Sequence, residues 1–437
     1  MNREELIMVC YSDIAGQVRG KGFPAKDLPY RLSKGVGWTP TNIMITAFGP
    51  IADSPWGALG DLILLPDLDT ETHVDFGDGS PAEHFFLGDV LELDGRPWSC
   101  CPRQFLRSAL DALQKQGLTI LAAFEHELYY EGATERIGSG YSLDSIRRQG
   151  EFAEAYLHAL DKAGLEPETF LPEYGPRQYE VTYRPAAGMV AADRAVILRE
   201  LAKATAIRLG ERVSFAPMVR PDGGVGNGVH IHMSLQDLDG RPVTYDRATA
   251  TKLSQTGGSF VAGVLKHMPA LCAITAPSVV SYQRLVPNKW SAAYNNLGTR
   301  DREAGVRICP TSKVGGGDTL TQFNVEYRAA DAAASPYLAL GALVWAGVEG
   351  LKADLPPPAD HHGMPADFDE AAWKEKGVVR LPQSLSAALD TLEADSAARS
   401  WFPELLLTAY LRYKRFEVDL MKDKTLEELC AQYGEAY

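Results

Sequence analysis

Apolar and polar residues alternate along residues 121–130, and this alternation predicts a β-strand. Every second residue from Phe124 to Leu128 points to one face of that strand, whereas Glu125 and Glu127 point to the other. Two carboxylates on one face of a mostly apolar strand repel each other unless a cation or a proton lies between them. The pattern therefore favours a metal site over a pair of acids that face solvent.

The spacing of the apolar runs divides the chain into two parts. Short runs separated by Gly and Pro predict a small sheet with loops, and we assign it to an N-terminal domain over residues 1–95. The second domain, residues 96–437, begins with a helix that is predicted to start at Pro102. Strands and helices alternate beyond it, and Asp193 is predicted to cap a long helix that stops at Gly210.

The last part of the chain is predicted to be mainly helical. A helix over residues 257–268 is followed by an irregular stretch, residues 277–308, and loops of that length in a compact domain usually have a function. The run 336–348 is strongly apolar but too short to span a bilayer, so we interpret it as a buried helix. Further helices are predicted over residues 381–395 and 404–421.

Acidic and imidazole side chains recur on the other predicted strands and turns. They are Glu173, Glu180, His230, His232 and Glu326. The strands of one curved sheet can bring such side chains to a single cavity. Carboxylates with imidazoles and no thiolate select Mg²⁺ or Mn²⁺ over zinc. We therefore predict a site for hard divalent cations.

Four arginines lie in one third of the sequence: Arg284, Arg302, Arg307 and Arg328. Individually, arginines are more often surface ion-pair partners than ligand clamps. Guanidinium groups beside an oxygen-ligated metal, however, position a phosphoryl group and neutralise its charge. The residues by themselves thus indicate an enzyme that handles metal ions and phosphate, and nothing narrower.

The composition is that of an ordinary globular protein, with 45% hydrophobic and 23% charged residues among 437. The formal net charge of −14 argues against nucleic acid or an anionic membrane as a partner. The six cysteines show no paired spacing, and we interpret them as reduced thiols of a cytoplasmic protein. The N-terminal residues lack an apolar core, so no signal peptide is predicted.

Taken together, these segments resemble the glutamine synthetase superfamily over nearly the whole chain. They occur in the family's order: YSDIAGQVRGKGFPA, GDLILLPDLDT, EHE, EYGPRQYE, GVHIHMSL, SYQRLVP, RDREAGVRI and VEYRAAD. The resemblance implies an α+β fold, in which a small N-terminal β-grasp domain precedes a large catalytic domain. That catalytic domain would contain a curved antiparallel sheet, or half barrel, flanked by helices.

The resemblance also implies ATP-dependent amide formation. In that reaction the γ-phosphoryl group of ATP is transferred to the side-chain carboxylate of glutamate, and an amine then attacks the acyl phosphate. The implied cofactors are two or more Mg²⁺ or Mn²⁺ ions per site, with ATP as co-substrate. The implied assembly is a homo-oligomeric double ring, a decamer or dodecamer, with sites between subunits.

Family roles transfer to individual residues of this sequence. The implied ligands of the metal near the amine are Glu127, Glu173 and Glu180, and those of the metal near the ATP phosphates are Glu125, His230 and Glu326. The residues implied to bind glutamate or the transferred phosphate are Gly226, His230, Arg284 and Arg328. Those implied to bind ATP are Glu125, His232, Ser234, Arg302 and Arg307. Those implied in catalysis are Glu173, Trp290, Arg302 and Asp61, the last as a base from the neighbouring subunit.

Two departures from the family pattern concern the substrates. The family's Asn-Gly-x-Gly is here VGNG, residues 225–228, and the glutamate expected six residues after Arg284 is replaced by Trp290. An aromatic ring at this position can pack on carbon atoms and stack on a cationic amine. The departure favours an organic amine as nucleophile, as in a γ-glutamylamide or γ-glutamylpolyamine synthetase.

Several alternatives stay open at this point. Trp290 could simply pack its loop, and ammonia could be the nucleophile, with glutamine as the product. A catalytically silent, oligomeric relative would use the fold for binding or structure. A phosphotransferase on the related kinase-type barrel is a third alternative, and the segment around Asp61 argues against it. The residues do not specify which amine is used, or whether glutamate is the only acid accepted.

Overall fold

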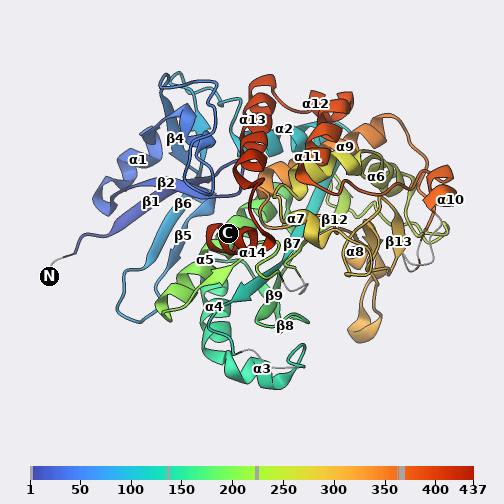
Figure 1. Cartoon of the computed structure of the whole chain (residues 1–437), viewed down its shortest axis with the longest axis horizontal. Helices are drawn as coiled ribbons and strands as arrows, with labels where there is room; N and C mark the ends of the chain where they lie inside the picture. Colours follow the sequence, from blue (N-terminus) through green and yellow to red (C-terminus); the bar gives the residue numbers. More distant parts are fainter. Residues whose placement is uncertain (1–2, 135–137, 222–225, 362, 364–369) are drawn as a thin grey trace.

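The structure is a computed structural model that describes residues 3–134, 138–221, 226–361, 363 and 370–437 (Figure 1). Within these residues a smaller sheet lies near the N-terminus and a larger one in the rest of the chain. Helices cover the larger sheet and surround it. The predicted α+β fold, with a small N-terminal domain followed by a larger domain built on a curved sheet with helices around it, is confirmed.

The N-terminal sheet has six strands in the described residues, in the order β2-β1-β6-β4-β3, with β5 paired to β6. β1 and β6 run parallel, and the other pairs are antiparallel. The strands are β1 (Leu6–Ser12), β2 (Val18–Pro24), β3 (Val36–Trp38), β4 (Leu62–Pro66), β5 (Thr72–Val74) and β6 (Glu83–Leu91). The helical segments between them are η1 (Ala25–Asp27), α1 (Leu28–Lys34), η2 (Pro40–Met44) and η3 (Leu68–Thr70).

The larger sheet has the order β13-β14-β15-β12-β7-β9-β8, with β10 and β11 paired to β7. Its strands are β7 (Leu118–Tyr130), β8 (Pro167–Pro172), β9 (Gln178–Tyr183), β10 (Ala186–Ala187), β11 (Val213–Ser214), β12 (Val229–Asp237), β13 (Leu297–Thr299), β14 (Val306–Ile308) and β15 (Val325–Tyr327). Side chains along β7 alternate between buried and partly exposed positions, with Phe124 buried and Glu125 half-buried. The strand and the two faces that the sequence predicts there are therefore confirmed.

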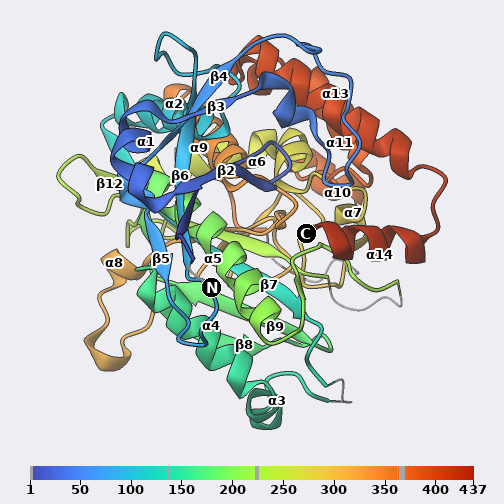
Figure 2. The same ribbon diagram turned by 90° about the vertical axis from the view of Figure 1, so that its left-hand side faces the viewer.

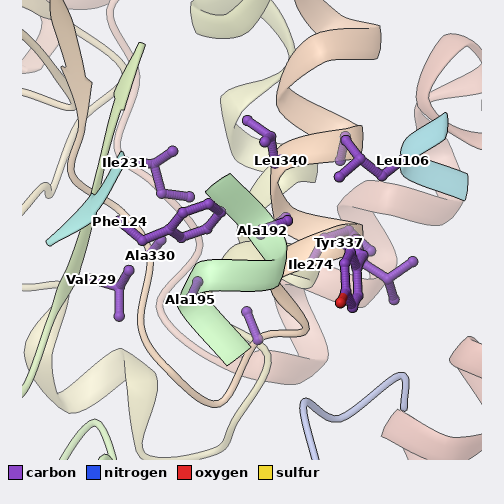
Figure 3. Close-up of a cluster of buried hydrophobic side chains, with 14 of the residues drawn as sticks. Leu106, Phe124, Ala192, Ala195, Val229, Ile231, Ile274, Ala330, Tyr337 and Leu340 are labelled. Carbon is purple, nitrogen blue, oxygen red and sulfur yellow. The ribbon is translucent and has the colours of Figure 1, made fainter. Parts of the chain in front are cut away.

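The helices of the second domain pack on this sheet and on one another. They are α2 (Pro102–Gln114), α3 (Leu143–Arg148), α4 (Gly150–Lys162), α5 (Gly188–Arg208), α6 (Gln255–Thr275), α7 (Ser281–Arg284), η4 (Val314–Gly316), α8 (Thr319–Gln322), α9 (Pro336–Lys352), α10 (Glu370–Glu375), α11 (Leu385–Ala394), α12 (Ser396–Ser400), α13 (Glu404–Met421) and α14 (Leu426–Ala436). Figure 3 shows Phe124 and Ile231 of the sheet facing Ala192 of α5, with Leu340 of α9 beyond it. Alanines on α5 let this helix lie close to the apolar face of the sheet.

Helices α6 and α9 pack closely because glycines line their contact. A Cβ atom at Gly263 would lie 2.1 Å from the carbonyl oxygen of Ala346, and one at Gly350 would lie 2.0 Å from that of Ser259. Almost all of α9 is buried, which confirms the buried helix predicted there. α6 has the length and hydropathy of a membrane-crossing helix, but 83% of its most apolar window is buried inside the protein, as in a core helix.

The C-terminal helices connect the two domains. Figures 1 and 2 both show α13 beside the N-terminal domain. The backbone N–H of Ala47 donates to the Tyr413 hydroxyl at 3.0 Å, and Arg412 forms an ion pair with Asp53 at 2.9 Å. The six cysteines are buried free thiols, and the cytoplasmic location stays a prediction.

The prediction that Asp193 caps a helix is wrong. α5 begins at Gly188, and Asp193 lies inside it. Its carboxylate accepts hydrogen bonds from the Arg103 guanidinium at 2.9 and 3.1 Å and from the Tyr337 hydroxyl at 2.5 Å. The residues before Asp193 continue the helix back to Gly188, and the acid balances a buried cation inside the protein.

Arg103 explains why that acid is needed. This side chain, 1% exposed, also pairs with Asp67 at 2.9 Å and with Asp89 at 3.3 Å. Asp67 and Asp89 belong to the N-terminal domain, whereas Asp193 belongs to the second domain. Removing one partner of a buried ion pair typically costs about 3–5 kcal/mol of folding free energy. Arg103 therefore fixes how the small domain sits on the domain that carries the candidate site.

Candidate active site

Strand register places acidic and imidazole side chains opposite one another on the larger sheet. Glu125 of β7 pairs with His230 of β12, and Glu127 of β7 pairs with Glu180 of β9. Residues directly opposite in an antiparallel pair point to the same face, with Cβ atoms about 4.5–5.5 Å apart. The sheet itself therefore collects side chains that are far apart in the sequence.

Glu127, Glu173 and Glu180 form a first group, whose carboxylate oxygens lie within 4.8 Å of one another. Glu127 accepts hydrogen bonds from the backbone N–H of Gly228 at 2.7 Å and from the side-chain amide of Gln178 at 3.0 Å. These bonds fix the direction in which the Glu127 carboxylate points. The structure thus brings together the three residues that the family pattern implies for one metal.

Glu125 belongs to a second group that contains both histidines. Its oxygens lie 2.9 Å from His230 Nδ1 and 3.3 Å from His232 Nε2. Glu326 lies opposite His232 in the β12–β15 pair, and its Oε1 is 3.4 Å from His230 Nδ1. The sequence assigns His230 to a metal and His232 to ATP, whereas the structure places both imidazoles on the same two carboxylates.

Arginines balance the charge of the second group. Arg328 Nη1 donates to Glu326 Oε1, and Arg307 Nη1 donates to Glu326 Oε2 at 2.8 Å. Burial opposes the charge on Glu326, but Arg328, followed by the two histidines, lowers its pKa to about 2. Burial likewise opposes the charge on Glu125, and hydrogen bonds from the same histidines hold its pKa well below the ordinary value. Both carboxylates are therefore negatively charged at neutral pH, which is the form that coordinates a cation.

The first group has no such balance. In the part of the chain that the structure describes, no lysine or arginine forms an ion pair with Glu127, Glu173 or Glu180. Burial, and then the negative charges of Glu125 and Glu127, raise the pKa of Glu180 to about 10. Without a cation this group must hold a proton at neutral pH. Three carboxylates without a thiolate are the donor set that Mg²⁺ and Mn²⁺ prefer, so the residues fit a hard divalent ion.

Arg284 lies at the edge of the cluster, at the end of α7. Its side chain is 5% exposed, and its Nη2 donates to the carbonyl oxygen of Ala330 at 2.5 Å. A Cβ atom at Gly228 would lie 3.0 Å from Arg284 Nη1, so the glycine leaves room for the guanidinium group. Gly226 lets the backbone of Pro217 approach its own backbone closely, because a Cβ atom at Gly226 would lie 2.3 Å from the carbonyl oxygen of Pro217.

Comparison with known protein families identifies this arrangement. A model of the glutamine synthetase catalytic domain matches residues 99–433, and a model of the glutamine synthetase N-terminal domain matches residues 1–98. The chain belongs to the glutamine synthetase family. It is an ATP-dependent carbon–nitrogen ligase, and the catalytically silent and kinase-type alternatives are set aside.

Individual relatives share the whole length of the chain. Gamma-glutamylpolyamine synthetase GlnA3 of Streptomyces coelicolor is 33% identical, over 99% of this chain and 93% of that protein. Glutamine synthetase of Thermococcus kodakarensis is 30% identical, over 91% of this chain and 86% of that protein. A solved crystal structure of a novel glutamine synthase homolog is 42% identical, with a TM-score of 0.93, over 100% of this chain and 99% of that one.

The loop after Arg284 is held by a residue that the sequence analysis missed. Glu303, 7% exposed, accepts the backbone N–H of Asn288 at 3.0 Å and that of Trp290 at 2.7 Å. Asn288 and Trp290 have φ values of 62° and 53°, which is the left-handed region that non-glycine residues rarely adopt. The carbonyl oxygen of Trp290 accepts a hydrogen bond from Arg328 Nη2 at 2.9 Å. The loop is thus held on both sides of Trp290, through the backbone N–H group and the carbonyl oxygen of this residue.

Three further polar residues contact the cluster without having been predicted. Gln178 orients Glu127, Asn324 Oδ1 lies 2.9 Å from His232 Nδ1, and Cys309 Sγ lies 3.6 Å from the same nitrogen. Gln178 could have been found from the sequence, since it precedes Glu180 by two positions on one strand. Cys309 directly follows β14 and Asn324 directly precedes β15, and strands of three residues give no clear alternation.

The remaining predicted residues lie at the margins of the cluster or away from it. Arg302 is exposed, and its backbone carbonyl accepts Arg328 Nε at 3.1 Å. Ser234 is half-buried on β12, four residues beyond His230. Asp61 is exposed just before β4, and no described hydrogen bond or ion pair joins it to the cluster. Val225 lies outside the described residues.

Loading the site with Mn²⁺ should release the proton that Glu180 holds. Because the raised pKa of Glu180 means that the carboxyl group is protonated at neutral pH, the apparent Mn²⁺ affinity should rise about tenfold per pH unit between about pH 6 and 8. Calorimetry in two buffers of different ionisation enthalpy measures the number of protons released. Glu180→Gln is the matched variant and should release at least one proton fewer.

Equal proton release from the wild type and Glu180→Gln would contradict this assignment.

Glu127→Ala should abolish ATP-dependent amide formation while leaving the circular dichroism spectrum unchanged, because it removes a predicted metal ligand and no core contact. Full turnover in Glu127→Ala would show that the metal site lies elsewhere.

Proposed function

We propose that the protein joins glutamate to an organic amine and produces a γ-glutamyl amide. The proposal rests on Trp290, which occupies the place of the family's loop glutamate. The indole is 64% exposed, and the guanidinium carbon of Arg302 lies 6.0 Å from its ring centroid. An exposed aromatic face beside the cluster suits the carbon chain of an amine better than it suits ammonia.

The loop itself contains no carboxylate that could replace the missing one. The loop sequence LVPNKWSA, residues 285–292, contains no acid. Glu303 is the nearest acid in sequence that contacts this loop, but each of its two oxygens already accepts a backbone N–H group. It therefore holds the loop and is not directed at a nucleophile. The similarity to a γ-glutamylpolyamine synthetase supports the same proposal.

The proposed reaction has two steps. An oxygen of the glutamate side chain attacks the γ-phosphorus of ATP, and ADP leaves. The amine nitrogen then attacks the carbonyl carbon of the acyl phosphate, inorganic phosphate leaves, and the nitrogen loses a proton. Metal ions held by Glu125, Glu127, Glu173, Glu180, His230 and Glu326 would supply charge neutralisation when bound.

The residues of the chain have distinct roles in this scheme. Arg284 and Arg328 bind the glutamate carboxylate and the transferred phosphate, and Arg302 and Arg307 neutralise the nucleotide phosphates with Ser234 and His232 nearby. The loop that contains Trp290 covers the acyl phosphate against water. Asp61 takes the proton from the amine, with Glu173 providing negative charge for its amino group.

Asp61 is proposed to act across a subunit boundary in a double ring. It lies in the small domain, exposed and without a described contact to its own cluster. Mixing Asp61→Ala with Arg302→Ala subunits should therefore restore part of the activity, because one hybrid interface then contains both side chains. No recovery in verified mixed oligomers would contradict the shared site.

A panel of amines tests the proposed substrate class. Phosphate release that depends on both ATP and glutamate should be at least about tenfold more efficient with an alkyl-, aryl- or polyamine than with ammonia, since a well-placed aromatic contact contributes about 1–2 kcal/mol. Mass spectrometry of the products identifies the amide. A preference for ammonia over every amine tested would contradict the proposal.

Variants of exposed aromatic residues provide the control. Trp290→Ala should raise the KM for the preferred amine about tenfold and leave the KM for ATP within about twofold. Tyr30 is a matched position, because it is 59% exposed with the Arg31 guanidinium carbon 5.3 Å from its ring, but it lies on α1 in the small domain. Tyr30→Ala should leave the amine KM unchanged.

Glutamine formation from ammonia is the second candidate function. It is supported by relatives named glutamine synthetase at about the same level of identity. It would require another acid to hold ammonium in place of the loop glutamate, and it would leave Trp290 as a residue that packs its loop.

A further inference from the structure

Two imidazoles and a carboxylate meet on the N-terminal sheet, in a different domain from the active site. His73 of β5 lies directly opposite His84 of β6 in an antiparallel pair. Their rings are stacked, with centroids 4.3 Å apart and 22° between the planes. Glu5, just before β1, reaches both rings, with its Oε1 2.6 Å from His84 Nδ1 and 3.6 Å from His73 Nε2. One ligand atom from each residue lies within 4.8 Å of the other two.

Glu71 contacts His84 from the other side. Its Oε1 lies 3.0 Å from His84 Nε2, so the ring is held between two carboxylates. The His84 side chain is only 8% exposed, and its ring centroid is 5.8 Å from that of Phe86. Histidines that bind metals usually have the second ring nitrogen held by a carboxylate, which fixes the orientation of the ring. His84 has this arrangement, with Glu5 on one nitrogen and Glu71 on the other.

An ion pair alone does not account for this cluster. A protonated His84 would satisfy both Glu5 and Glu71, but His73 would then stack on a cationic ring while directing Nε2 at the same Glu5 oxygen. Among the described residues, Glu5 and Glu71 have only histidines as ion-pair partners, since the nearby Lys26 pairs with Glu4. Two carboxylates beside two neutral imidazoles leave a negative charge that a divalent cation would balance.

We propose that Glu5, His73 and His84 bind a divalent transition-metal ion of the zinc type, with Glu71 as the residue that orients His84. Two imidazoles and one carboxylate are a donor set that suits Zn²⁺. The ligands belong to the start of β1 and to β5 and β6. A bound ion would join these segments and stabilise the native small domain, because it binds the folded chain and not the separated segments.

Zinc binding to the full-length protein tests this site. With Mg²⁺ in large excess to occupy the hard-cation sites, a titration with Zn²⁺ against a chromogenic chelator should show one additional tight ion per chain. His73→Ala should weaken the affinity at least about 100-fold, and Glu71→Gln should weaken it about 10–100-fold. His73 is suitable because its side chain is 53% exposed, so its removal leaves no cavity in the core.

Two variants separate this site from other zinc binding. His158→Ala removes an exposed histidine of α4 and should bind Zn²⁺ like the wild type. His230→Ala removes an imidazole from the active-site group that contains both histidines and should retain the additional ion. Zn²⁺ should also raise the Tm of the wild type, and not that of His73→Ala. The proposal is overturned if His73→Ala binds Zn²⁺ as tightly as the wild type, or if His230→Ala loses the ion.

Discussion

Carboxylates that share one face of a sheet can all be charged only if cations separate them, and the second domain is arranged around this constraint. The register of β7 with β9 and β12 forces Glu125, Glu127, Glu180 and His230 together. Arginines balance the charge on one side of the cluster, whereas a proton or a metal ion must balance it on the other. This imbalance of charge is unfavourable for the protein alone, and binding of a hard cation would relieve it.

Arg328 links this cluster to the loop that contains Trp290. Its guanidinium group donates to Glu326, to the backbone carbonyl of Arg302 and to that of Trp290. Glu303 holds the same loop through two N–H groups from the other side. The loop position is therefore determined by contacts with Glu303 and with Arg328, which also binds Glu326 of the cluster. A ligase that must protect an acyl phosphate from water benefits from this direct connection.

Sequence patterns predicted the elements whose side chains follow a regular period. Alternation along β7 gave the two faces correctly, and the family motifs named residues that the structure brings together, although their roles remain proposals. Glu303 was missed because it lies in an irregular segment, where no period indicates the direction of a side chain. Asp193 was misassigned because its partner, Arg103, is ninety residues away. Likewise, the pairing of His73 with His84 depends on a register that composition does not reveal.

The proposed function requires that a phosphoryl group pass from ATP to the glutamate side chain before the amine attacks. Glutamate labelled with ¹⁸O in its side-chain carboxylate tests it directly, in a reaction with ATP and the best amine from the panel. If an acyl phosphate forms, its breakdown leaves one glutamate oxygen on phosphorus, so mass spectrometry should find one ¹⁸O atom in each inorganic phosphate released. Phosphate that contains no ¹⁸O, formed at the same rate as the amide, would contradict the account.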